Sequence, residues 1–72
     1  MYKNKIKEYR KKKGLTLREV AEMCGISTGY LSHLEKGSRD NPSKEVMENI
    51  SQVLNKSIPE IFFSDWKLYS FF

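Results

Sequence analysis

The sequence predicts an all-α fold, a compact domain of five short helices with a short aromatic extension at the C-terminus. Three observations support this prediction. Apolar residues recur with the period of a helix, helix-capping side chains precede these segments, and glycine or asparagine follows them. No segment shows the strict period-two alternation of a strand. With 72 residues, the chain has the length of one small domain, near the lower limit at which a core holds without disulfides or metals.

The first predicted helix runs from about residue 2 or 3 to residue 12. Ile6 and Tyr9 lie on its inner face, and lysines occupy its outer face. Gly14 follows and ends the helix, because glycine readily adopts the left-handed backbone found at helix ends.

The second predicted helix covers residues 17–24. Thr16 precedes it and Glu19 stands three residues later, so the two side chains form a capping box in which each satisfies an unpaired backbone N–H. Gly25 ends the helix. The inner face of this helix consists of Leu17, Val20, Ala21 and Cys24.

The third predicted helix covers residues 28–36, with Ser27 as its cap and Gly37 at its end. Leu31 and Leu34 lie on one face, and Tyr30 lies near the edge of that face. The opposite face is small and polar over an arc of about 140°. This polar face consists of Thr28, Gly29, Ser32, His33 and Lys36.

Two further helices follow a polar loop at residues 37–42. Ser43 caps the fourth helix and Asn55 ends it. Ser57 and Glu60 form a second capping box at the start of the fifth helix, which runs from about residue 58 to residue 63. The inner face of the fourth helix consists of Val46, Met47, Ile50, Val53 and Leu54.

The order of helix, glycine turn and helix over residues 17–36 is typical of a helix-turn-helix that binds DNA. Small polar residues at the start of its second helix suit an approach to base edges in the major groove. Residues 1–44 carry eleven Lys and Arg against five Asp and Glu, a balance of +6, whereas residues 45–72 carry a balance of −2. The sequence therefore predicts double-stranded DNA as the partner, bound in a salt-dependent manner.

Several other classes of protein and site are disfavoured. One cysteine permits no internal disulfide, and one histidine beside it gives no metal-ligand cluster, so we expect no metal or other cofactor. Cys24 is expected to be an ordinary core thiol. The chain has neither a carboxylate pair arranged for catalysis nor a glycine-rich phosphate loop, so we expect no enzyme and no small-molecule ligand. No apolar stretch approaches the ~20 residues of a membrane span, and we expect a cytoplasmic location.

An ordered set of residues along the chain matches a known family. With this set, the chain resembles the lambda-repressor-like helix-turn-helix domains of phage repressors, Cro proteins and their bacterial relatives. The resemblance covers about residues 3–63 and implies a compact five-helix domain over residues 1–63. In such a domain the third helix enters the major groove and the second lies across the DNA backbone. The matching residues are Ile6, Arg10, Gly14, Leu15-Thr16, Glu19-Val20-Ala21, Gly25-Ile26-Ser27, Tyr30-Leu31-Ser32, Leu34-Glu35, Gly37, Asn41-Pro42-Ser43, Ile50, Leu54 and Ile58-Pro-Glu-Ile-Phe.

The resemblance implies that the start of the third helix contacts base edges. Thr28 and Ser32 are the first candidates, because a hydroxyl can donate or accept a hydrogen bond. His33 either donates to a guanine or a phosphate, or is an ordinary exposed histidine. Gly29 departs from the usual long polar side chain, which either permits close backbone approach or means that the helix contacts fewer bases. Without the Gln or Asn that binds adenine bidentately, we expect DNA shape to supply part of the specificity.

Contacts to the DNA backbone are expected around the same helices. Leu17 replaces the Gln that contacts phosphate in many relatives, so Arg18 or backbone N–H groups must take that role. Tyr30 is expected either to pack inward or to bind a phosphate, and each other candidate has the alternative of being an ordinary surface residue. The candidates are Arg18, Ser27, Tyr30, Lys36, Arg39, Asn41 and Lys44.

The resemblance also implies a structural ion pair. Arg10 on the first helix and Glu35 on the third are expected to join these two helices rather than to contact a ligand. Removing one partner of such a pair leaves an uncompensated charge in the fold.

The aromatic C-terminal extension, residues 64–72, lies past the usual end of the family. Residues 62–72 hold six of the nine aromatic residues, a density that indicates an interface. We expect a homodimer, which would place two third helices about 34 Å apart on the DNA. The alternatives are that the extension folds back over the core, binds another protein, or belongs to a fragment. The dimerisation candidates are Phe63, Trp66, Leu68, Tyr69, Phe71 and Phe72.

The sequence thus predicts a sequence-specific DNA-binding transcriptional regulator, a repressor. One alternative is a protein-interaction module of the antitoxin or antagonist type that uses its aromatic extension on a partner. Another is nonspecific coating of nucleic acid by the lysine-rich first helix.

Overall fold

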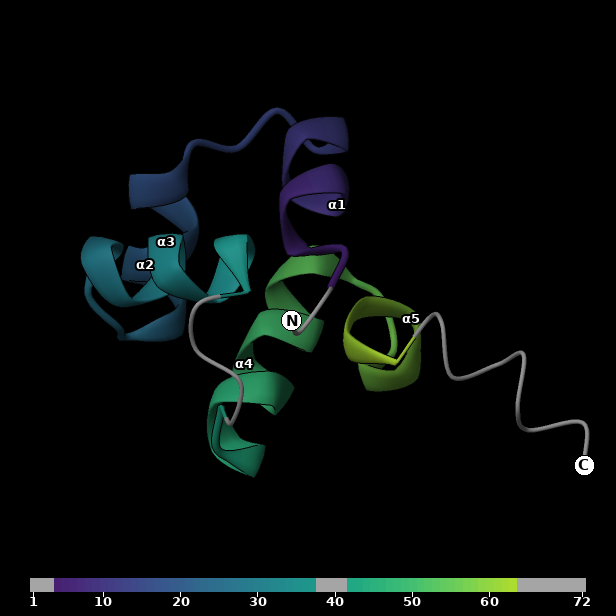
Figure 1. Cartoon of the computed structure of the whole chain (residues 1–72). Helices are drawn as coiled ribbons and strands as arrows, with labels where there is room; N and C mark the ends of the chain where they lie inside the picture. The colour runs from purple at the N-terminus through teal and green to yellow at the C-terminus, as the bar shows by residue number, and fades with distance from the viewer. Residues whose placement is uncertain (1–3, 38–41, 64–72) are drawn as a thin grey trace, which may run out of the picture.

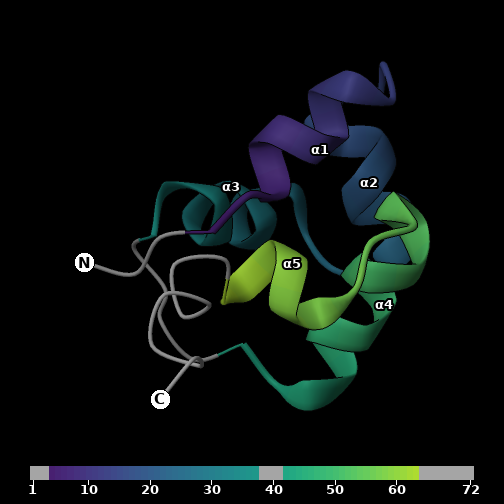
Figure 2. The same cartoon turned by 90° about the vertical axis from the view of Figure 1, so that its right-hand side faces the viewer.

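In the part of the chain that the structure describes, five α-helices pack around one core. The structure is a computed structural model that describes residues 4–37 and 42–63. The helices are α1 (Ile6–Lys12), α2 (Leu17–Cys24), α3 (Thr28–Lys36), α4 (Lys44–Leu54) and α5 (Ile58–Phe62). Helix α4 packs against α1, α2 and α5, while α3 packs mainly against α2 (Figures 1 and 2). The all-α, five-helix architecture expected from the sequence is confirmed.

Local side-chain caps start four of the helices. At α2, Thr16 Oγ1 accepts from the Glu19 N–H at 3.1 Å, and Glu19 Oε1 accepts from the Thr16 N–H at 2.8 Å. The same reciprocal pair joins Ser57 and Glu60 at the start of α5. Ser27 caps α3 and Ser43 caps α4 in the simpler form, with one accepted hydrogen bond each. Each cap satisfies a backbone donor that has no partner within its helix.

Left-handed residues end the three central helices. Gly25 after α2 has φ of 71°, and Gly37 after α3 has φ of 79°. Asn55 after α4 is in the same region, with φ of 56°. The short turn between α2 and α3 therefore depends on Gly25, since a residue with a Cβ is strained at this φ.

Helix α1 begins later than the sequence predicts. Its first residue is Ile6, and Lys5 is already outside the helix. Asn4 Oδ1 accepts from the Ile6 N–H at 3.0 Å, and the Lys5 N–H donates to the Ile61 carbonyl at 2.8 Å. This hydrogen bond to α5 competes with helix formation before Ile6, so the prediction of a start near residue 2 or 3 was wrong for residues 4 and 5. Helix α5 similarly ends at Phe62, one residue before the predicted end.

The core draws on all five helices. Each inner-face residue predicted for α1 to α4 is buried or packs partly buried against the core. Phe62 is also buried, at 3% exposed, so it belongs to the core rather than to the aromatic extension, whereas Phe63 is 39% exposed. The buried residues are Ile6, Val20, Ala21, Cys24, Leu31, Leu34, Ile50, Leu54, Ile61 and Phe62. The remaining dimerisation candidates, Trp66, Leu68, Tyr69, Phe71 and Phe72, lie outside the described residues.

Candidate nucleic-acid interface

Helices α2 and α3 form a compact pair on one side of the domain (Figure 1). Three residues separate them, and the backbone turns back on itself at Gly25. Ile26 packs partly buried against the core, which holds the turn close to the rest of the domain. This geometry places the start of α3 at the surface and its middle against the core.

Helix α3 presents two different faces. Leu31 and Leu34 are fully buried and anchor the helix. Thr28, Gly29 and His33 are exposed, and Ser32 is partly buried. An added Cβ at Gly29 would meet no atom within 4 Å, so the space above the backbone at this position is open. The exposed part of α3 is small and polar at its start, which leaves the helix accessible to a groove.

The start of α3 also presents hydrogen-bond donors that suit a negatively charged ligand. Ser27 Oγ accepts from the Tyr30 N–H at 3.0 Å, and its own hydroxyl hydrogen remains available to donate. The N-terminus of a helix favours negative charge, because its backbone dipoles align and its first N–H groups point outward. No acidic residue lies in the first turn of α3.

The predicted DNA-backbone candidates occupy several positions around α3. Arg18, Ser27, Lys36 and Lys44 are exposed. Tyr30 is partly buried and packs against the core, so the ring of this side chain has a structural role whatever its hydroxyl does. Arg39 and Asn41 lie outside the described residues.

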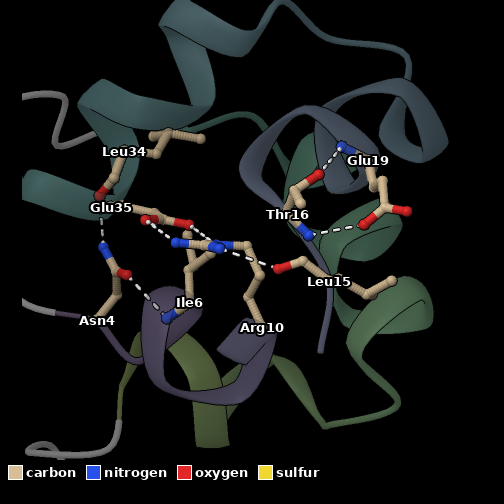
Figure 3. Close-up of polar contacts among 8 residues, drawn as sticks. All are labelled: Asn4, Ile6, Arg10, Leu15, Thr16, Glu19, Leu34 and Glu35. Carbon is tan, nitrogen blue, oxygen red and sulfur yellow. Dashed lines mark hydrogen bonds and ion pairs between the residues drawn. The ribbon is translucent and has the colours of Figure 1, made fainter. Parts of the chain in front are cut away.

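An ion pair ties α3 to α1. Arg10 Nε donates to Glu35 Oε2 at 2.6 Å and Nη2 donates to Glu35 Oε1 at 3.2 Å, while Nη1 donates to the Leu15 carbonyl at 3.0 Å (Figure 3). The side chains of Arg10 and Glu35 are only 11% and 8% exposed. Arg10 therefore joins three segments, α1, the segment before α2, and the last turn of α3.

Two lysines, one just before α1 and one at its end, form ion pairs with Glu8 of α1. Lys5 and Lys12 lie 3.6 and 3.5 Å from the Glu8 carboxylate. Lys12 and Lys56 also approach the Tyr9 ring, with Nζ 5.8 and 5.1 Å from its centroid, within the range of a cation–π contact. Part of the positive charge on and next to α1 therefore already has partners within the domain, Glu8 and Tyr9.

Neither a metal site nor a reactive thiol is visible in the part of the chain that the structure describes. No group of three His, Cys, Asp or Glu residues lies close enough there to hold a metal ion. Burial raises the pKa of the Cys24 thiol, which keeps it neutral within the core. None of the described helices is long and apolar enough to cross a membrane.

The pattern of α2, turn and α3 within a five-helix core matches a known family over most of the chain. The family described as Helix-turn-helix matches residues 6–61. The chain belongs to this family. The lambda-repressor-like resemblance expected from the sequence is confirmed.

Among relatives in the helix-turn-helix family, the transcriptional regulator SinR of Bacillus subtilis is 43% identical over 58 residues, which are 81% of this chain and 52% of SinR. A crystal structure of SinR in complex with DNA has a TM-score of 0.70 at 45% identity, covering 74% of this chain and 84% of that one. A structure of a complex of SinR with SinI has a TM-score of 0.71 at 44% identity, covering 75% and 52%. The chain spans about half the length of the curated SinR that it matches.

Sequence reasoning missed one residue that contacts the helix-turn-helix from the segment before α1. Asn4 is partly buried and its Nδ2 donates to the Leu34 carbonyl of α3 at 2.7 Å (Figure 3). An asparagine near the start of a helix indicates a cap, but nothing in the local pattern indicates a partner thirty residues away.

Proposed function

We propose that the chain is a sequence-specific double-stranded DNA-binding transcriptional regulator, a repressor, whose helix α3 enters the major groove. One observation carries the proposal. Helix α3 buries Leu31 and Leu34 and leaves its polar start exposed, in a domain similar to SinR, which has been solved in complex with DNA. Under this proposal the protein binds DNA, catalyses no reaction and needs no cofactor. It acts in the cytoplasm, where the DNA is.

The exposed start of α3 supplies the proposed base contacts. Thr28 and Ser32 can donate to or accept from base edges, and the Thr28 methyl can contact a thymine methyl. His33 can donate to a guanine acceptor. Gly29 carries no side chain and leaves room for the groove wall to approach the backbone.

The proposed backbone contacts surround these residues. Phosphate contacts fix the position of a protein on DNA, and they come from Lys and Arg, from hydroxyls and from helix N-termini. Their exposure supports this role for Arg18, Lys36 and Lys44. The full proposed set is Arg18, Ser27, Tyr30, Lys36, Arg39, Asn41 and Lys44.

Selection of bound duplexes from a random pool tests the proposal. We expect enrichment of one short sequence, and weaker binding to it when Ser32 or His33 is changed to alanine. Gln52→Ala, at an exposed position on α4, serves as the matched control and should bind as the unchanged chain does. A pool that shows no enrichment would contradict sequence-specific binding.

We propose that the chain binds DNA as a homodimer through Phe63 and the aromatic extension at residues 64–72. The exposure of Phe63, at 39%, supports an apolar contact at this end of α5. Two α3 helices about 34 Å apart would meet successive major grooves on one side of the DNA. The mass of the chain at the concentration of DNA binding tests this, and a mass of one chain would exclude the dimer.

A protein partner is the second candidate function. The solved complex of SinR with SinI favours it, because it contains a relative of this chain bound to another protein. Under this proposal, binding depends on the aromatic extension and not on α3. If substitutions of Trp66 or Phe72 lower the affinity for the partner, and substitutions of Ser32 or His33 leave it unchanged, the protein-interaction function is favoured.

A further inference from the structure

We infer that Asn4 is a positioning residue for the DNA-binding helix α3, an inference that rests on the proposed function. Both ends of its carboxamide are used. Oδ1 accepts from the Ile6 N–H at the start of α1, and Nδ2 donates to the Leu34 carbonyl in the last turn of α3 (Figure 3). Since only the amide nitrogen can donate to a carbonyl, the two bonds fix the orientation of the carboxamide.

The bond from Asn4 lies beside the ion pair from Arg10. Leu34 and Glu35 are consecutive residues of α3, and each is bound by a residue from the first segment of the chain. One attachment point would let the end of α3 pivot about it, whereas two attachments restrict that rotation. Helix α3 packs mainly against α2, and these polar bonds join its last turn to α1 and to the segment before α1.

The two ties differ in what their loss does. The Arg10–Glu35 pair is nearly buried, so removal of one partner leaves a poorly solvated charge and endangers the fold. Asn4 is neutral and only partly buried, and Leu34 stays in the core without it. The Leu34 carbonyl also accepts from the Gly37 N–H at 3.1 Å, so it keeps a partner. Loss of the Asn4 bond therefore leaves a folded domain in which the direction of α3 is less restricted.

A less restricted α3 should discriminate less between DNA sequences. Base contacts require geometry held to within about half an ångström, whereas general attraction to phosphate tolerates small rotations. Asn4 thus acts on specificity through α3, without touching the DNA itself.

The substitution Asn4→Ser tests the inference. Serine keeps a capping oxygen before α1 but is too short to reach the Leu34 carbonyl. The matched control is Asn49→Ser, since Asn49 Nδ2 donates to the Cys24 carbonyl at 3.5 Å and ties α2 to α4, leaving α3 untouched. Melting curves of the three proteins set a temperature at which all are folded.

The measured quantity is the ratio of affinities for two DNA probes. One is the duplex selected by the unchanged chain, and the other is a scrambled duplex of the same composition. We expect Asn4→Ser to lower this ratio about fivefold, the discrimination lost when one base contact is misplaced, with affinity for the scrambled duplex unchanged. Asn49→Ser should keep the ratio.

Several results would overturn the inference. A folded Asn4→Ser protein with an unchanged ratio would show that Asn4 does not position α3, while the proposed function would stand. An equal fall of the affinity ratio in Asn49→Ser would show that loss of any such bond loosens the whole domain, rather than α3 alone. An unchanged chain that binds both duplexes equally would overturn both the inference and the proposed function. If Asn4→Ser does not fold, Asn4→Thr gives the same test, because threonine also keeps a capping oxygen before α1 and has no amide donor that reaches the Leu34 carbonyl.

Discussion

Single residues on α3 either hold the helix in place or remain available to a ligand. Leu31 and Leu34 are buried, and Glu35 is bound by Arg10. Three other residues of α3 are exposed and do not contribute to the core: Thr28, Gly29 and His33. Substitutions in the first group should therefore change stability, and substitutions in the second should change DNA binding.

The Arg10–Glu35 pair gives the clearest stability prediction. Glu35→Ala leaves the guanidinium of Arg10 nearly buried without its carboxylate and should lower the free energy of unfolding by about 3 kcal/mol. For a domain of this size, the melting temperature should fall by more than about 10 °C. Glu22→Ala, at an exposed position on α2, is the control and should melt close to the unchanged chain. An unchanged melting curve for Glu35→Ala would exclude a structural role for the pair.

Gly29 gives a prediction in which stability and binding change in opposite directions. Glycine within a helix is about 1 kcal/mol less favourable than alanine, and a Cβ at this position meets nothing, so Gly29→Ala should raise the melting temperature. The added methyl would separate α3 from the groove wall, so the affinity for the selected duplex should fall.

Gly25→Ala is the contrasting control, since the positive φ of Gly25 makes alanine destabilising there. If Gly29→Ala is stabilised and keeps its affinity, α3 contacts fewer bases at this position and the backbone does not approach closely.

At the scale of the helices, local chemistry determines most boundaries. The caps at Thr16, Ser27, Ser43 and Ser57 act within three residues, which is why the sequence predicted where α2 to α5 begin. The start of α1 instead depends on the Ile61 carbonyl, a partner far along the chain. Sequence patterns contain no information on such a contact, so this boundary was predicted wrongly.

The capping box of α2 should contribute measurably to stability. Thr16→Ala removes the acceptor for the Glu19 N–H and should lower the free energy of unfolding by about 1 kcal/mol, which thermal melting can detect. Thr16→Ser keeps the hydroxyl and should melt near the unchanged chain. Equal melting temperatures for Thr16→Ala and Thr16→Ser would show that the cap does not support α2.

At the scale of the whole molecule, the sequence predicted the fold and the exposed start of α3, because helical periodicity separates buried from exposed faces. It gave no indication that Asn4 bonds to α3, since this depends on how α1 and α3 meet in space. The aromatic density over residues 62–72 also counted Phe62 toward an interface, whereas α5 carries Phe62 into the core. The family resemblance predicted the Arg10–Glu35 contact between helices, whereas the helical pattern alone predicted the helices but none of the contacts between them.

Binding to DNA by the whole domain should weaken steeply with salt, because bound phosphates release counterions. Lys36→Ala should reduce the slope of log affinity against log salt by about 1, the contribution of one phosphate contact. Lys56, which lies between α4 and α5 and approaches Tyr9, is the control, and Lys56→Ala should keep the slope. Equal slopes for all three proteins would remove Lys36 from the DNA interface.

In the proposed complex the start of α3 faces DNA, and amide chemical shifts measured on addition of the selected duplex test this placement. We expect the largest changes between Ser27 and Lys36, with smaller changes near Arg18 at the start of α2. Changes concentrated on α4 and α5, with α3 unaffected, would contradict it.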